Sequence, residues 1–151
     1  MTTNAILDQV QLRLSAPDGT GTYNYDLSAT GVVIESAGDI AFPTVPMVLW
    51  AMQSLDEEDG PELGDYQETA TIVVACAVPA TADTAKARRT AVCNVVDDIK
   101  QGLRADRGLS DQALDAGPFL VTSLPGEAFG LGPAVAAIYG QITIRWWEDG
   151  T

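Results

Sequence analysis

The hydrophobic pattern is clearest between residues 66 and 104, where an apolar run precedes a periodic segment. From Thr69 to Val78 the chain carries no charge and is rich in β-branched residues, and Pro79 closes the run. Continuous apolarity is typical of a strand with both faces covered, so we predict a central strand here. Its bulkier side chains share one face, which we expect to meet a helix: Ile72, Val74, Cys76 and Val78.

Apolar residues recur at helical spacing in the segment after this strand. They stand three, four or seven positions apart: Ala85, Val92, Val96, Ile99 and Leu103. Because this spacing places them on one side of a helix, we predict an amphipathic helix over residues 82–104. Thr81 or Asp83 is expected to cap its first turn. Asp97 and Asp98 are assigned to its solvated face.

Other patterns predict the elements on either side of this unit. Helical spacing of apolar residues predicts an N-terminal helix over residues 3–15. Short apolar runs predict strands over 31–36, 45–54 and 119–124, and prolines at the entry of the second place it at an edge or a bulge. A long last strand over 134–147 alternates, which indicates one buried face. Its apolar positions are Ala136, Ile138, Ile142, Ile144 and Trp146.

These elements predict an α+β protein with a mostly antiparallel, mixed sheet on which the N-terminal helix and the long helix pack. The chain has 151 residues, enough for one core, so residues 1–151 are expected to form a single domain. The stretch 125–133, rich in glycine and proline, is expected to be a flexible loop. With no apolar run of about 18 residues and no basic leader, we expect no membrane span and no signal peptide.

Acidic residues dominate the charge of the chain. Twenty-one acidic residues stand against eight basic ones, which gives a net charge of −13. Proteins that grip nucleic acids cluster lysine and arginine to neutralise phosphates. The balance therefore argues against a nucleic-acid binder of that kind.

Six acids fall within residues 56–65, between two predicted strands: Asp56, Glu57, Glu58, Asp59, Glu62 and Asp65. Like charges at this density repel one another, so we predict an exposed, mobile loop. Three interpretations stay open, namely a solvated loop, a calcium or magnesium site, and a functional electrostatic surface. The spacing does not fit an EF-hand, because Leu55 stands where the first aspartate would be.

The absence of histidine from the sequence excludes Ser-His-Asp and Cys-His mechanisms and histidine-based metal sites. The glycines of 125–133 match no phosphate-binding loop. We therefore expect no enzyme, no cofactor and no metal. Cys76 and Cys93 are expected to be small buried thiols, and whether they pair stays open.

Two arginines and one tryptophan are candidates for contacts with another subunit. Arg88 and Arg89 lie early in the predicted long helix, beside its apolar line. They either extend from the edge of the core or form salt bridges to a neighbouring acidic subunit. Trp146 and Trp147 must face opposite sides of their strand. If Trp146 belongs to the core, Trp147 either anchors an interface or is covered by another element.

The order and length of these segments resemble the tail terminator proteins of long-tailed bacteriophages and the related tail-completion and neck proteins. The resemblance spans nearly the whole chain and rests on this order. Its segments are the helix at Ile6–Leu14, the proline-marked stretch Phe42–Pro46, the acidic loop, the strand Tyr66–Val78, the helix Ala82–Arg104 and the closing strands that end at Ile142–Trp146.

The resemblance implies a structural virion protein that assembles as a homo-oligomer, a six-fold ring on the end of the tail tube. Such a ring stops polymerisation of the tail tube protein and joins the tail to the head connector or head-closure protein. DNA would pass through its lumen without specific binding. The protein would belong to the tail or neck of the virion, after assembly in the host cytoplasm.

In such a ring, one patch of each subunit meets a different patch of the next. The acidic loop against Arg88 and Arg89, with Trp147 as an apolar anchor, would supply complementary patches. Two alternatives stay open. One is another neck or tail component, such as a head-closure or tube protein, and the other is a small-molecule-binding α+β dimer.

Overall fold

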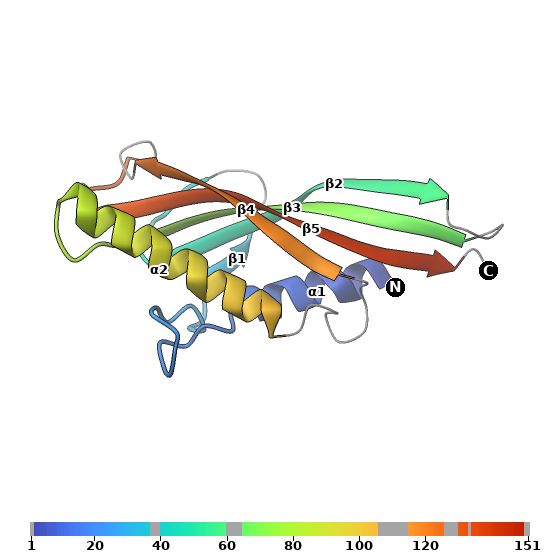
Figure 1. Cartoon of the computed structure of the whole chain (residues 1–151), viewed down its shortest axis with the longest axis horizontal. Helices are drawn as coiled ribbons and strands as arrows, with labels where there is room; N and C mark the ends of the chain where they lie inside the picture. Colours follow the sequence, from blue (N-terminus) through green and yellow to red (C-terminus); the bar gives the residue numbers. More distant parts are fainter. Residues whose placement is uncertain are drawn as a thin grey trace.

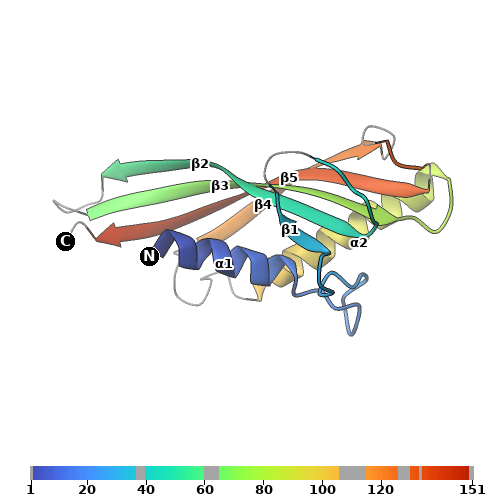
Figure 2. The same ribbon diagram turned by 180° about the vertical axis from the view of Figure 1, so that it is seen from behind.

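A computed structural model describes residues 2–36, 40–59, 65–105, 115–125, 130–132 and 134–149. Within these residues, two helices lie along one side of a five-stranded, mixed and mostly antiparallel sheet (Figures 1 and 2). The predicted α+β class is therefore confirmed. The elements are α1 Thr2–Leu14, β1 Val33–Glu35, β2 Met47–Asp59, β3 Asp65–Pro79, α2 Ala85–Arg104, β4 Asp115–Pro125 and β5 Val135–Asp149.

The sheet has the strand order β1-β2-β3-β5-β4, so the strand predicted to be central is central. β2 and β3 form one long antiparallel hairpin whose register runs from Met47 opposite Ala77 to Asp59 opposite Tyr66. β5 lies along the other side of β3 over the whole length of both strands. Among the described strands, β1 is the one that runs parallel to its neighbour, and there it pairs with Val48–Trp50.

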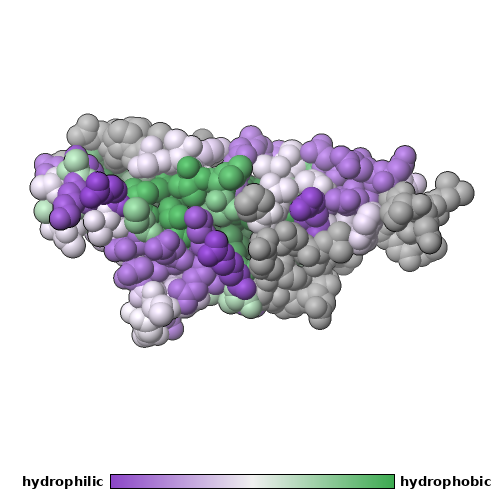
Figure 3. Space-filling model, in the orientation of Figure 1, coloured by the Kyte–Doolittle hydropathy of each residue, from purple (hydrophilic) through white to green (hydrophobic). Residues whose placement is uncertain are grey.

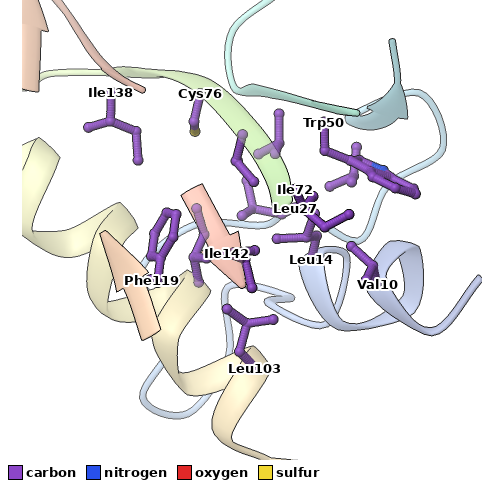
Figure 4. Close-up of a cluster of buried hydrophobic side chains, with 14 of the residues drawn as sticks. Val10, Leu14, Leu27, Trp50, Ile72, Cys76, Leu103, Phe119, Ile138 and Ile142 are labelled. Carbon is purple, nitrogen blue, oxygen red and sulfur yellow. The ribbon is translucent and has the colours of Figure 1, made fainter. Parts of the chain in front are cut away.

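The main hydrophobic core lies between the sheet and the two helices (Figure 4). The face of β3 that was predicted to meet a helix is buried in it, and so are the even-numbered apolar positions of β5. From α1 the core receives Ile6, Val10 and Leu14. β3 is apolar on both faces because, near its end, the main core covers one face and a second apolar cluster covers the other.

Two glycines are required by close packing. At Gly140, which interrupts the apolar positions of β5, an added Cβ would lie 2.5 Å from the Phe119 ring. At Gly102 of α2, an added Cβ would lie 2.6 Å from the backbone carbonyl oxygen of Arg13, at the contact between the two helices. Both distances are shorter than any normal contact of a Cβ atom. An alanine at either position would therefore displace the neighbouring group that the glycine allows to approach.

The start of α2 differs from the prediction. The helix begins at Ala85, and Thr84 is the N-cap, with its hydroxyl accepting a hydrogen bond from the backbone N–H of Ala87 at 3.1 Å. Thr81 and Asp83 are therefore not the cap. The connection between Pro79 and α2 is longer than expected, so the helix and its cap begin later in the sequence.

Asp98 was assigned to the solvated face of the long helix, and this was wrong. The residue is fully buried, and its carboxylate accepts three hydrogen bonds from the loop that precedes β1. The backbone N–H and the Nδ2 of Asn24 donate to Oδ1 at 2.8 and 3.0 Å, and the N–H of Tyr25 donates to Oδ2 at 2.8 Å. A buried carboxylate is stable when it is hydrogen-bonded in this way, and Asp98 thereby fastens the loop to α2.

Candidate interaction surfaces

The acidic residues 56–59 lie in the last part of β2, so their prediction as a loop was wrong. They pair with β3 in continuous register, from Asp56 opposite Thr69 to Asp59 opposite Tyr66. Because all four side chains are exposed to water, their repulsion is screened and the backbone ladder forms in spite of it. β3 begins at Asp65, and Glu62 lies outside the described residues.

This end of the sheet, which we call the tip, consists of residues 52–59 of β2, 66–70 of β3 and 144–147 of β5. β1 leaves β2 after Trp50, so the outer edge of β2 from residue 51 onward pairs with no strand in the described part of the chain. Charged side chains on an open edge discourage unwanted strand pairing. Preventing unwanted strand pairing is therefore a structural role that the acids of β2 can fill without binding a ligand.

The two faces of the tip carry different side chains. Leu55 lies opposite Ala70 of the core face, and Glu57 and Asp59 follow on the same face because strand residues alternate. Asp56 and Glu58 therefore lie on the other face. Trp147 shares that other face, because it and Glu58 both pair with Gln67.

The expected opposition of the two tryptophans is confirmed. Trp146 is buried in the main core, whereas 45% of Trp147 is exposed. Trp147 is thus available on the surface of the tip, two strands away from the acids of β2. Whether it anchors an interface stays a prediction.

Basic residues gather on α2. This helix carries five of the eight basic residues of the chain and two of the 21 acidic ones. Its net charge is therefore +3, and that of the rest of the chain is −16. Arg88 Nη1 lies 2.6 Å from Asp83 Oδ1 in a surface ion pair, and Arg89 is exposed. The five bases are Lys86, Arg88, Arg89, Lys100 and Arg104.

The arginines and the acids lie at opposite ends of the molecule, as Figure 1 shows for the start of α2 and the end of β2. α2 follows Pro79, the last residue of β3, while Tyr66 marks the tip. At roughly 3.4 Å per residue, β3 separates these two residues by about 44 Å. The structure therefore does not bring the predicted partners together within one subunit.

An apolar surface lies where α2 meets β4, visible as the green area of Figure 3. Its half-buried residues, which we call the valine patch, are Val92 and Val96 of α2 and Val121 of β4. Cys93 of α2 is exposed and Cys76 is buried, and both are free thiols. The expectation that both cysteines are buried was thus wrong for Cys93. The helical spacing correctly places Val92 and Val96 on the apolar side of α2, but it does not indicate that they stay partly exposed.

Burial raises the pKa of the Cys76 thiol far above its ordinary value, so this side chain is a neutral core residue. Burial, followed by the nearby Asp98 carboxylate and Cys76, also raises the pKa of the Tyr25 hydroxyl. Because Cys93 is exposed and Cys76 is buried, Cys93 is the thiol that reagents in solution can reach.

A pocket of about 130 Å³ lies on the face of the sheet opposite the helices. It is lined by Ser36, Ile40, Leu49, Trp50, Ala51, Val73, Ala75 and Tyr139. Pockets for small molecules usually enclose about 300 Å³ or more, so this one is small for a metabolite. In the described part of the chain, no three residues of the metal-binding types stand together as a metal site.

No described helix is long and apolar enough to cross a bilayer. No protein-family model matches the sequence, and no curated protein matches it either.

Proposed function

We propose that this chain is the subunit of a ring in the tail or neck of a bacteriophage, acting as a tail terminator. In this role the ring caps the tail tube, stops its polymerisation and joins the tail to the head connector. The fold class agrees with the one that the resemblance implies, with both helices packed on a mostly antiparallel sheet. Fold agreement alone is a weak argument, because one fold serves many functions.

The observation that carries the proposal is the separation of charge along the subunit. The acidic tip and the arginines of α2 are complementary surfaces near opposite ends of β3, whose residues Tyr66 and Pro79 lie about 44 Å apart at about 3.4 Å per residue. Complementary surfaces at opposite ends favour a head-to-tail contact between copies. Contacts of that type close into a ring when the rotation between neighbours divides the circle.

The net charge of −13 also suits a ring through which DNA passes. An acidic surface repels phosphates and so reduces adhesion to the passing duplex. The acids do not have to face the lumen for this purpose, because like charge elsewhere on the ring also discourages binding.

Two alternatives remain. Another tail or neck component would share the ring and differ in its position, so only its place in the particle separates it from a terminator. The other is a small-molecule-binding dimer, for which the described pocket opposite the helices, about 130 Å³, is small.

A capping experiment tests the function directly. Purified protein is added to growing cognate tail tubes, and their lengths and ends are examined by electron microscopy. A terminator stops growth and decorates one end of each tube. Tubes that keep growing with bare ends would contradict the proposal, and density along the tube wall would favour a tube component.

A second experiment tests the arginines. Replacing both by glutamate, Arg88→Glu with Arg89→Glu, is expected to abolish rings and leave the monomer folded, because both side chains lie on the surface. Arg104→Glu, at the other end of α2, is a control with half the change in charge and should leave rings intact. Intact rings in the double variant would remove both arginines from the interface.

A further inference from the structure

Two apolar surfaces are partly exposed, one beside α2 and one on the helix-side face of β2. One is the valine patch of Val92, Val96 and Val121. The other lies on β2, where Met52 is 38% exposed and Leu55 is 43% exposed. Each surface continues into charged residues, and the two charges are of opposite sign.

We propose that residues 52–59 of β2 in one copy dock on the valine patch and the first turns of α2 in a second copy. Leu55 would contact Val92 and Val96, and Glu57 and Asp59 would reach Arg88 and Arg89. The inference rests on the proposed assembly into rings. It deepens that proposal by naming the face of the tip that makes the contact and the apolar centre of the interface.

The spacing of apolar and charged residues agrees between the two surfaces. On α2, Arg88 precedes Val92 by four residues, a rise of about 6 Å along one face of the helix. On β2, Glu57 follows Leu55 by two residues on one face, a rise of about 7 Å. A leucine seated on Val92 therefore brings the carboxylate of Glu57 to the level of Arg88.

The ion pair that Arg88 forms within its own subunit does not prevent this contact. Its ion pair with Asp83 joins two exposed side chains, 37% and 58% accessible. Exposed pairs contribute little stability, so this ion pair can be exchanged for one with a carboxylate of another copy at small cost. Arg89 is exposed and extends the same basic surface.

The contact joins two copies of the chain and is not made within one subunit. Its apolar residue at the tip is Leu55 and not Trp147. Within one copy the first turns of α2 and the acidic end of β2 lie at opposite ends of the molecule (Figure 1), and β3 and β5 separate β2 from β4, the strand of Val121. Trp147 faces the other side of the tip and lies two strands from β2, at about 5 Å per strand. Leu55, by contrast, is on the same strand and face as Glu57 and Asp59.

Charge reversal with rescue tests the face that docks. In the background Arg88→Glu with Arg89→Glu, where rings are lost, Glu57→Lys with Asp59→Lys should restore them, because the two charges are exchanged. Asp56→Lys with Glu58→Lys is the matched control, since it adds the same charge to the same strand on the opposite face. Mass photometry and electron microscopy measure the ring fraction at equal protein concentration.

The outcomes separate the inference from the proposed function. Rescue by the Glu57 and Asp59 pair alone supports the docking. Equal rescue by both pairs, rescue by the control alone, or no rescue by either would overturn it while wild-type rings keep the ring proposal standing. A wild-type protein that stays monomeric overturns both.

Disulfide trapping provides a measurement that does not depend on charge. With Cys93 replaced by serine, the pair Leu55→Cys and Val92→Cys should form a ladder of covalent oligomers under diamide, which oxidises two thiols to a disulfide. Formation requires Cα atoms within about 7 Å, so the ladder reports direct contact between copies. The pair Trp147→Cys and Val92→Cys is the control. A ladder in the control and none in the test pair would overturn the docking.

Discussion

Asp98 and the acids of the tip are the same kind of side chain in opposite surroundings. Asp98 is buried and accepts three hydrogen bonds, two of them from backbone N–H groups, whereas residues 56–59 are exposed along an open strand edge. A carboxylate that has lost its water must be satisfied by the protein, and its removal leaves donors without partners. The acids of the tip keep their water, so their contribution to folding is small and their charge stays available to a partner.

The same contrast holds for the two ends of the molecule. Around α2, glycine packing, the Asp98 hydrogen bonds and the main core specify one arrangement of loop, helix and sheet. At the tip, Ile144 and Trp146 of β5 are buried, whereas residues 55–59 of β2 are exposed and the edge of β2 is open. We therefore expect substitutions in the first region to change stability and substitutions in the second to change association.

The largest difference is expected between adjacent residues of β5. Trp146→Ala removes a fully buried ring and should lower the free energy of unfolding by about 4 kcal/mol. Trp147→Ala removes a half-exposed ring on the other face and should lower it by less than about 1 kcal/mol. Urea denaturation followed by circular dichroism measures both. Equal losses would mean that the tip is packed on both faces.

Asp98→Ala is expected to lower the free energy of unfolding by about 3 kcal/mol, because it leaves two backbone N–H groups of the loop without acceptors. Asp98→Asn retains one acceptor oxygen and should fall between this variant and the wild type. The same urea titrations provide the values. A loss below about 1 kcal/mol for the alanine variant would show that the loop does not depend on this carboxylate.

Gly102→Ala is expected to lower the free energy of unfolding by about 2 kcal/mol, because the new methyl group would collide with the backbone of α1. Gly132→Ala is the control, since no atom lies within 4 Å of the Cβ that it adds. Thermal unfolding of both variants provides the comparison. A stabilised Gly102 variant would mean that α1 can move away from α2 without loss.

The smallest effect on folding is expected at the tip. Glu57→Gln and Glu58→Gln should each change the free energy of unfolding by less than about 0.5 kcal/mol, because both side chains are exposed. Measured on the monomer in urea, the two variants should be indistinguishable. Measured on the assembled protein, Glu57→Gln should weaken association more than Glu58→Gln does.

The sequence predicts most of the fold because its strongest patterns come from burial on a regular period. The uncharged run of β3, the alternation of β5 and the spacing of Ile6, Val10 and Leu14 each indicate the correct element and the correct buried face. The single domain expected over residues 1–151 and the flexible loop over 125–133 stay predictions. Of that loop, 126–129 and 133 lie outside the described residues.

The site residues were harder to predict, because their surroundings depend on contacts distant in sequence. Asp98 stands three residues after Val95 and seven after Ala91, which are both buried, so the helical period could have placed it on the buried face. Its donors, however, are more than 70 residues away in the chain. The acids of the tip form a strand because β3 pairs with them, and their composition alone favours a loop.

Averaged electron micrographs of the purified protein alone test whether the chain assembles head to tail into a ring. We expect closed rings with six-fold symmetry and an open centre, which disappear in Arg88→Glu with Arg89→Glu and persist in Arg104→Glu. Monomers at all concentrations, or a two-fold dimer with a filled centre, would contradict it.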